Sequence, residues 1–373
     1  MALKKYLNRI YKEIFSPYYR GSRLFIFGIR FMIYFWKFLP LPKKSRAIFI
    51  FDVRTNSITY DFANVLYLVY KFFEVFGFSE YEVIVFTPES YKINPFESGS
   101  YSSFVSSKDI HARIDELIIP LALTAKCVSN VQRVNQIATI KNIIDSSSAY
   151  IYPPFYDPNY YSPEVCSYRR LFDSFSKETY PPSYPGHRYI TDDDSSFKNN
   201  ILDCKSDITK ISYITLTLRD YGFSPLRNTI EEDIFKAFDF AKYLNCELVI
   251  VPDSMEKLKE YKMPSNIILS SSSRFNLNKR IYLYSESKVN IFSVSGPRII
   301  SLFIQGSKTI AFRFGNGTVN DPNCDSSLLY YKIHQNLNYS DQPDLPFQGY
   351  SIWHSPNKDY SVNDLIYAFG KLN

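Results

Sequence analysis

Apolar runs and helical patterns alternate along the first half of this chain. Residues 47–52 form an apolar run that ends in an aspartate, which predicts a buried parallel strand. Apolar positions then recur at helical spacing over 61–76, and 82–86 predict a second strand. This order predicts a βαβ unit, and 114–125 and 131–144 predict further helix or strand segments.

Residues 150–200 interrupt the alternation. Repeated Tyr-Pro and Asp-Pro pairs and the run Asp192-Asp193-Asp194 predict irregular, solvated chain there. The alternation then resumes, and we expect Asn228 or Thr229 to cap a helix. The predicted strands of this second half cover 211–218, 247–253, 289–294 and 309–314, and its helices cover 231–244, 280–287 and 296–304.

The length of the chain, 373 residues, exceeds what one hydrophobic core usually organises. Together with the alternation, it predicts an α/β fold with two doubly wound, Rossmann-like domains. We place these domains at residues 47–200 and 201–373, behind an N-terminal segment of residues 1–46.

The N-terminal segment differs in charge from the rest of the chain. Residues 1–46 carry eleven Lys or Arg and one acid, whereas the remainder carries 32 basic and 36 acidic residues. Within the segment, the apolar and aromatic run 24–41 is interrupted by Arg30 and Lys37, which share one helix face. This pattern favours a helix lying on an anionic membrane surface. Packing on the protein's own core and a helix that spans the membrane are the alternatives.

Cysteine and histidine usage argues against several kinds of protein. The five cysteines are scattered without a CxxC pair, which argues against a disulfide framework and fits a reducing compartment. The four histidines form no metal-binding grouping, so we expect neither a zinc site nor a cofactor. The acidic balance after residue 46 argues against a nucleic-acid partner. We therefore expect a cytoplasmic protein, peripheral on the membrane through residues 1–46.

A glycine turn between a strand and a helix is the first candidate binding feature. Ser295, Gly296 and Pro297 follow the strand predicted over 289–294. Proline is tolerated in a first helical turn, and glycine allows a ligand to approach the backbone. The free amides at a helix start favour phosphate. The alternative is a purely structural Gly-Pro turn.

A strand end with two arginines is the second candidate feature. Thr217 and Arg219 close one predicted strand, and Arg227 and Asn228 precede the next helix. Ligands of open α/β sheets bind beyond the carboxyl ends of the strands. Two guanidinium groups there could hold a diphosphate or a sugar carboxylate. Surface ion pairs with neighbouring acids are the alternative role for both arginines.

These two features in this order resemble the donor-binding half of GT-B glycosyltransferases, over roughly residues 205–315. The chain looks like the glycosyltransferases of bacterial surface-polysaccharide clusters. Its Gly296-Pro297 turn is similar to the Asp-Thr-Gly-Pro turn of the heptosyltransferase family, although Val294 or Ser295 stands where that family has its aspartate. A weaker similarity links Asp52 and residues 58–62 to the acceptor-side domain of the same group.

The resemblance implies a sugar transferase with a nucleotide-sugar donor and a glycan or lipid-linked acceptor. The donor would lie in a cleft between the domains, against Thr217, Arg219, Arg227, Asn228, Ser295, Gly296 and Pro297. If the reaction inverts the sugar, an acceptor hydroxyl needs a general base, and Asp52 and Asp61 are the candidates. Either carboxylate can instead be a structural cap. GT-B enzymes generally need no metal held by protein carboxylates, so the resemblance implies none.

Two other functions remain open from the sequence. The same scaffold can carry another transferase or an epimerase, because fold does not determine function. The missing aspartate before Gly296 also fits a catalytically silent, membrane-associated scaffold or nucleotide-sugar-binding protein of a polysaccharide assembly complex. Donor, acceptor, stereochemical outcome and oligomeric state are not determined by the sequence.

Overall fold

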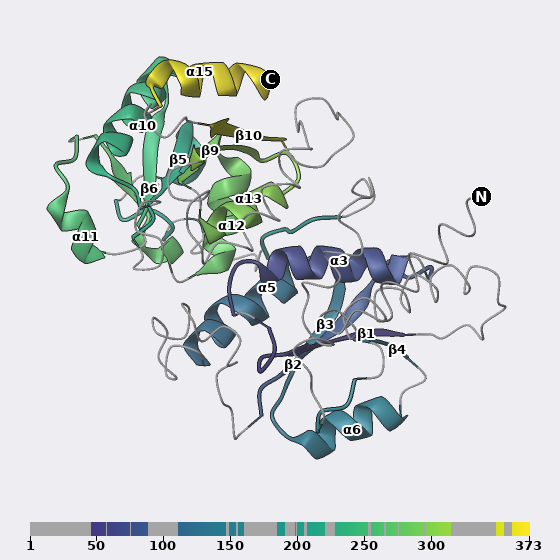
Figure 1. The fold of residues 1–373 in the computed structure, drawn as a ribbon. Coiled ribbons are helices and arrows are strands. Elements are labelled where there is room, and N and C mark those ends of the chain that lie inside the picture. Colours follow the sequence, from purple (N-terminus) through teal and green to yellow (C-terminus); the bar gives the residue numbers. More distant parts are fainter. Residues whose placement is uncertain are drawn as a thin grey trace, which may run out of the picture. The chain divides into compact units, whose positions relative to one another are not determined.

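The structure is a computed structural model of the whole chain, shown in Figure 1. It describes residues 46–56, 58–74, 76–88, 111–146, 149–153, 156–159, 185–190, 198, 200–204, 207–220, 228–252, 255–264, 266–274, 276–293, 295–314, 348–353 and 360–373. The predicted membrane segment 1–46 lies outside this part of the chain except for Arg46. Within the described ranges, we find no helix long and apolar enough to cross a bilayer.

The contacts between residues divide the chain into two compact units. Unit 1 comprises residues 1–57, 65–96 and 127–181. Unit 2 comprises residues 58–64, 97–126 and 182–373. Because each unit is assembled from separate segments, this division does not test a single boundary along the chain. The boundary near residue 200 and the cleft between two domains therefore stay predictions.

The described part of unit 1 is built around a parallel sheet with the strand order β3-β2-β1-β4. This is the order of the first four strands of a Rossmann fold. Helices lie on both faces of the sheet (Figure 1). The elements are β1 (Ala47–Asp52), α3 (Phe62–Glu74), β2 (Tyr81–Phe86), β3 (Val128–Val134), α6 (Ile137–Ser146) and β4 (Tyr150–Tyr152).

All six residues of β1 are buried, as the apolar run predicts. Ile48 and Ile50 pack in one cluster with Ile140 of α6. Phe49 points the other way and contacts Tyr152, which in turn contacts Phe72 of α3. Alternate side chains of β1 therefore face opposite layers, which explains why the strand is apolar at nearly every position.

Two predictions for this region need correction. The segment predicted as helix or strand over 131–144 contains both, because β3 ends at Val134 and α6 begins at Ile137. Residues 150–152, predicted as irregular, form the edge strand β4. This strand is too short to show a pattern of its own, and its pairing with Ala47–Phe49 of β1 makes it a strand.

Unit 2 contains a six-stranded parallel sheet with the order β10-β9-β8-β5-β6-β7. Counted along the chain, this is the strand order 3-2-1-4-5-6 of a Rossmann fold. The parallel α/β fold predicted from the sequence is therefore confirmed. The strands are β5 (Tyr213–Thr217), β6 (Glu247–Val251), β7 (Ile268–Leu269), β8 (Asn290–Ser293), β9 (Lys308–Phe314) and β10 (Gln348–Trp353).

Helices cover both faces of this second sheet. Ile214 and Leu216 of β5, and Leu218 directly after it, pack in one cluster with residues of α10 and α15. Thr217 and Phe292 instead contact Tyr284 of α12. The helices of unit 2 are Ile114–Ile118 (a π-helix, η1), α5 (Ile119–Thr124), η2 (Ile208–Lys210), α10 (Glu231–Tyr243), α11 (Met255–Glu260), η4 (Ser271–Arg274), α12 (Leu277–Glu286), α13 (Gly296–Leu302) and α15 (Val362–Lys371).

The cap predicted for the helix after residue 230 is wrong. Helix α10 has Ile230 as its N-cap, and the Asp233 carboxylate accepts a hydrogen bond of 2.8 Å from the Ile230 amide. Thr229 is engaged elsewhere, because its amide donates to the Arg219 carbonyl and its hydroxyl accepts from the Arg219 amide. The first residues after β5 therefore hold Thr229 outside the helix.

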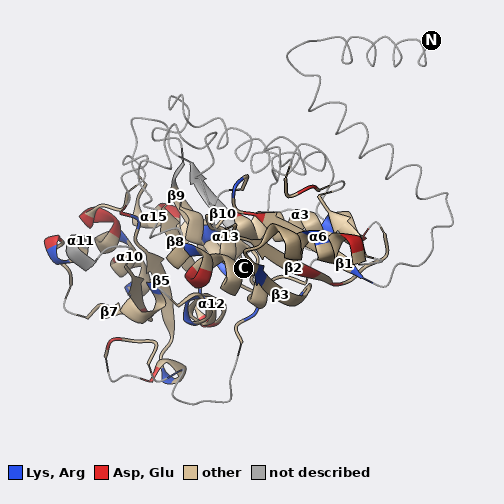
Figure 2. Ribbon diagram, turned by 90° about the horizontal axis from the view of Figure 1, so that it is seen from below, with Lys and Arg blue, Asp and Glu red and all other residues tan. Residues whose placement is uncertain are grey.

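Basic and acidic residues are interspersed along the described elements (Figure 2). This distribution agrees with the nearly balanced charge of the chain after residue 46. The basic excess of the protein is thus a property of its first 46 residues. Asp192-Asp193-Asp194 lies outside the described residues, as do Cys166 and Cys324.

Candidate functional site

The candidate site lies at the point in the unit 2 sheet where the strand order reverses. Here β5 pairs directly with β8, and Thr217 stands opposite Phe292. The chain leaves these two neighbouring strands toward opposite sides of the sheet. Such a switch point leaves a crevice beyond the carboxyl ends of the strands, where open α/β sheets bind their ligands. Both binding features predicted from the sequence come together at this place.

The end of β5 contributes Arg219, which is 7% exposed. Two backbone bonds of 2.9 Å join Arg219 to Thr229 and close the loop between them. The Arg219 guanidinium donates from Nη1 to the Asn228 side-chain oxygen. The structure therefore places two of the predicted donor-binding residues, Arg219 and Asn228, in contact. Arg227 lies outside the described residues.

Thr217 serves the packing of the sheet. It is buried, and its hydroxyl forms a hydrogen bond of 2.7 Å with the Tyr284 hydroxyl of α12. This bond ties β5 to the helix that covers this face of the sheet. Thr217 thus stabilises the end of β5 by its bond to α12.

The end of β8 contributes two serine hydroxyls. Ser293 is fully buried, and the Oγ atom of the partly exposed Ser295 is buried as well. Within the described part of the chain, neither hydroxyl has a hydrogen-bond partner. Buried polar groups in native proteins nearly always have a partner, so these two hydroxyls at the switch point are candidates for hydrogen bonding to a polar ligand. Ser293 was not identified from the sequence; its only signal is a polar residue at the end of an apolar strand.

Gly296 follows Ser295 and starts α13, with Pro297 as the next residue of the first turn. A Cβ atom at residue 296 would lie 2.8 Å from Cδ2 of Tyr60 and 3.0 Å from its Cβ. Glycine is therefore needed here because another side chain comes close to the backbone. The Tyr60 hydroxyl accepts a hydrogen bond of 2.7 Å from Nη1 of Arg280. Neither Tyr60 nor Arg280 was identified from the sequence, because only the tertiary fold brings them to the turn.

Asp61, one of the two predicted bases, immediately follows Tyr60. Residues 58–64 belong to unit 2, together with the turn at Gly296. The Asp61 carboxylate is partly buried and accepts a hydrogen bond of 3.2 Å from the Thr59 hydroxyl. The structure thus brings a partly accessible carboxylate into the same unit as Arg219, Ser293 and Ser295.

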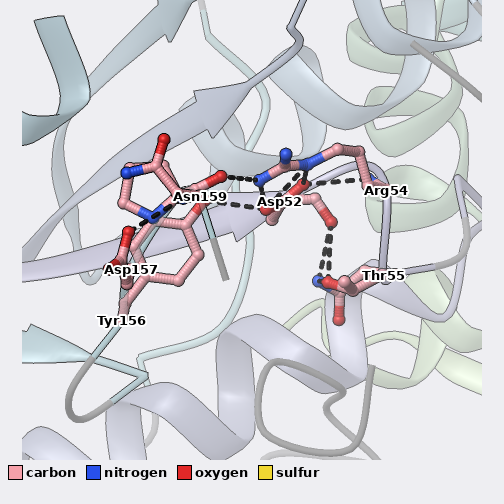
Figure 3. A network of polar contacts seen from close by, with 8 residues as sticks. Asp52, Arg54, Thr55, Tyr156, Asp157 and Asn159 are labelled. Atoms are coloured by element: carbon pink, nitrogen blue, oxygen red, sulfur yellow. Dashed lines mark hydrogen bonds and ion pairs between the residues drawn. The ribbon is translucent and has the colours of Figure 1, made fainter. Parts of the chain in front are cut away.

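Asp52, the other predicted base, lies at the carboxyl end of β1 in unit 1 (Figure 3). Its carboxylate is fully buried and forms an ion pair of 2.6 Å with Nη2 of Arg54. Oδ1 also accepts from the Arg54 amide and Nε, each at 3.0 Å. The Tyr156 hydroxyl donates to Oδ2 at 2.7 Å.

These contacts favour a structural role for Asp52. Each of its oxygens already accepts at least two hydrogen bonds, and a guanidinium lies against it. Burial acts to lower the pKa of Arg54, but the hydrogen bonds and the charge of Asp52 outweigh it and raise that pKa. The network orders the chain after β1, since the Asp52 carbonyl also accepts from the Asn56 side chain.

No group of three or more histidine, cysteine or acidic side chains within the described ranges is placed to hold a metal ion. Cys127, Cys204 and Cys246 are free cysteines.

No protein-family model and no curated protein matches this chain. Among solved structures, a glycosyl transferase family 9 protein from Veillonella parvula DSM 2008 has 12% sequence identity and a TM-score of 0.47 over 90% of this chain and 98% of that one. E. coli ADP-heptose lps heptosyltransferase II has 11% identity and a TM-score of 0.43 over 87% of this chain and 99% of that one. Similarities this distant, with TM-scores below 0.5, support no argument about function.

Proposed function

We propose that this protein is a GT-B glycosyltransferase that transfers a sugar from a nucleotide-sugar donor. The acceptor is a glycan or a lipid-linked acceptor in surface-polysaccharide biosynthesis, and we place the reaction at the cytoplasmic face of a membrane. The proposal rests on the sequence resemblance and on one structural observation. At the switch point of the unit 2 sheet, a nearly buried arginine lies at the end of β5, and two unsatisfied hydroxyls lie at the end of the neighbouring strand β8.

The chemistry of these groups suits a diphosphate. The guanidinium of Arg219 provides fixed positive charge, and the hydroxyls of Ser293 and Ser295 can donate hydrogen bonds to phosphate oxygens. When the bond between the sugar and the diphosphate breaks, negative charge develops on the leaving nucleotide. Positive and hydrogen-bonding groups already in place stabilise that charge without reorganisation.

Asp61 is the proposed base. In an inverting reaction, the acceptor oxygen bonds to the anomeric carbon of the sugar while the bond from that carbon to the diphosphate breaks. The acceptor hydroxyl gives its proton to the Asp61 carboxylate. Asp61 suits this role better than Asp52 because its side chain is partly accessible, whereas the Asp52 carboxylate is fully buried and paired with Arg54.

Calorimetric titration of the full-length protein with UDP, GDP, ADP and CDP tests the donor site. We expect at least one nucleotide to bind, and Ser293→Ala and Ser295→Ala to weaken that binding at least several-fold. The melting temperature of these variants should stay the same or rise, because removing an unsatisfied buried hydroxyl costs little stability.

Ser301→Ala is the matched control. Its hydroxyl is equally buried but bonds to Thr309 at 2.6 Å and to Ser307 at 3.0 Å. This variant should melt at a lower temperature and bind the nucleotide normally. If no nucleotide binds, or the serine variants bind as well as the wild type, the donor site is not here. Binding without transfer from any UDP-, GDP-, ADP- or CDP-sugar would instead indicate the non-catalytic binding protein.

A further inference from the structure

We propose that Tyr60 is a positioning residue that fixes the Asp61 carboxylate at the turn formed by Ser295, Gly296 and Pro297. This inference rests on the proposed function of Asp61. It concerns two contacts of Tyr60 within unit 2, one with Gly296 and one with Arg280.

The first contact locks the Tyr60 ring against the backbone. The space that a side chain at residue 296 would need is occupied by the Cβ, Cγ and Cδ2 atoms of Tyr60, all within 3.2 Å. These atoms lie close to the Tyr60 backbone, so the ring cannot make room by a small movement of its far end. Gly296 and Tyr60 therefore determine each other's position.

The second contact fixes the other end of the ring. Arg280 is 3% exposed, and its Nε and Nη2 atoms donate to the Ser273 and Arg274 carbonyls at 2.9 and 3.1 Å. Its Nη1 atom then donates to the Tyr60 hydroxyl at 2.7 Å. A guanidinium already held by two hydrogen bonds to backbone carbonyls offers a preorganised donor, so little entropy is lost when Tyr60 binds it.

Backbone hydrogen bonds connect the position of Tyr60 to the position of Asp61. The Tyr60 carbonyl accepts from the Ala63 amide at 3.1 Å, and the Thr59 carbonyl accepts from the Phe62 amide at 3.1 Å. The Thr59 hydroxyl bonds to both the amide and the carboxylate of Asp61, each at 3.2 Å. Fixing the Tyr60 ring therefore fixes the turn that carries the carboxylate. A misplacement of about 1 Å in a reacting group can cost roughly a hundredfold in rate.

Two variants of the full-length protein test this role, and a third serves as control. Tyr60→Phe removes only the bond to Arg280, and Gly296→Ala pushes the ring off the turn. The control Tyr360→Phe removes a comparable buried bond in the same unit, from the Tyr360 hydroxyl to Asp233 at 3.0 Å. We expect faster amide hydrogen exchange over residues 58–64 in both test variants and unchanged exchange there in the control.

Kinetics with the nucleotide sugar found in the donor screen provide the second measurement. Both test variants should lower kcat by about tenfold to a hundredfold. The KM for the donor should stay within twofold for Tyr60→Phe, because the residue acts on the base and not on the diphosphate. The double variant Tyr60→Ala/Gly296→Ala should lose less stability than the sum of the two single variants, because Tyr60→Ala removes the ring atoms that a side chain at residue 296 would meet.

The outcomes separate the two proposals. Unchanged exchange over 58–64 in both variants, or a wild-type kcat in Tyr60→Phe, would overturn the role of Tyr60 and leave the glycosyltransferase proposal standing. A wild type that transfers no sugar would overturn the proposed function and, with it, the positioning of a base.

Discussion

Arg219 and Arg54 show that neighbours decide what a buried arginine does. Arg54 is saturated by Asp52, the Pro158 carbonyl and the face of the Phe86 ring. Arg219 instead stands at a switch point, where its guanidinium donates to the side-chain oxygen of Asn228. Both residues are nearly buried, but only Arg219 lies at the predicted ligand site.

Arg219→Ala should keep a near-normal melting temperature and lose donor binding or turnover. The two bonds to Thr229 come from the backbone and survive the substitution. Losing one charge-assisted contact to the transition state costs about 2–4 kcal/mol, or roughly a hundredfold to a thousandfold in rate. Thermal melting and nucleotide titration measure the two effects.

Arg46→Ala provides the comparison. Arg46 forms an exposed ion pair of 2.7 Å with Glu82, which is worth about 0–1 kcal/mol. This variant should change neither property by much. An Arg219→Ala protein that melts several degrees lower and retains its activity would make Arg219 a structural residue.

His187 predicts a pH dependence of stability. The side chain is buried, its Nδ1 lies 3.1 Å from the Thr124 hydroxyl, and burial lowers the pKa of His187 to about 3. In the unfolded chain, a histidine titrates near pH 6.5. Between these values only the unfolded state binds the proton, so the free energy of unfolding should decrease as the pH falls from about 6.5 toward 3.

Urea unfolding at several pH values measures this slope. His187→Gln should reduce it, because glutamine does not titrate. Equal slopes in wild type and His187→Gln would show that His187 is not the group responsible.

At the scale of elements, the loop after β1 depends on the network of Asp52. The carboxylate holds Arg54 and Tyr156, and the Asp52 carbonyl holds Thr55 and Asn56. This loop therefore owes its conformation to side chains of β1 and of the segment after β4, and a local pattern in the sequence could not predict it.

Asp52→Asn should destabilise the protein by about 3–5 kcal/mol, because it leaves the nearly buried Arg54 charge without its partner. Urea unfolding measures this loss. Glu82→Ala, which breaks the exposed pair with Arg46, should cost only about 0–1 kcal/mol. A variant Asp52→Asn with wild-type stability and no turnover would identify Asp52, and not Asp61, as the base.

At the scale of the whole molecule, the sequence predicts that residues 1–46 are a detachable membrane anchor. Deleting residues 1–45 should release the protein from membranes and leave it folded. Arg46 is kept because its side chain binds Glu82 and its carbonyl accepts from the Tyr150 amide of β4. Membrane fractionation and circular dichroism test the prediction. A truncated chain that stays on membranes, or that unfolds, would contradict it.

The alternation of hydrophobic patterns was sufficient to predict most of the strands of the two sheets and most of the helices that cover them. Strands β1, β5, β6 and β8 are buried on both faces, so their continuous apolar runs are visible in the sequence. Helix α10 shows its amphipathic spacing for a related reason, since one face packs on the sheet and the other meets water. Burial against a neighbouring layer requires apolar residues at the buried positions, and this pattern can be recognised in the sequence.

Contacts between residues far apart in the chain produce no such pattern in the sequence. Strand β4 exists because β1 pairs with it, and the strand order that places the end of β5 next to the end of β8 follows from the crossover connections. Gly296 was identified as a possible approach point for a ligand, but the tertiary structure shows Tyr60 at that point. Hydrophobic periodicity determined the elements of this protein because it acts within each element. The tertiary structure alone decided which polar side chains meet, because those meetings depend on how the elements are joined and packed.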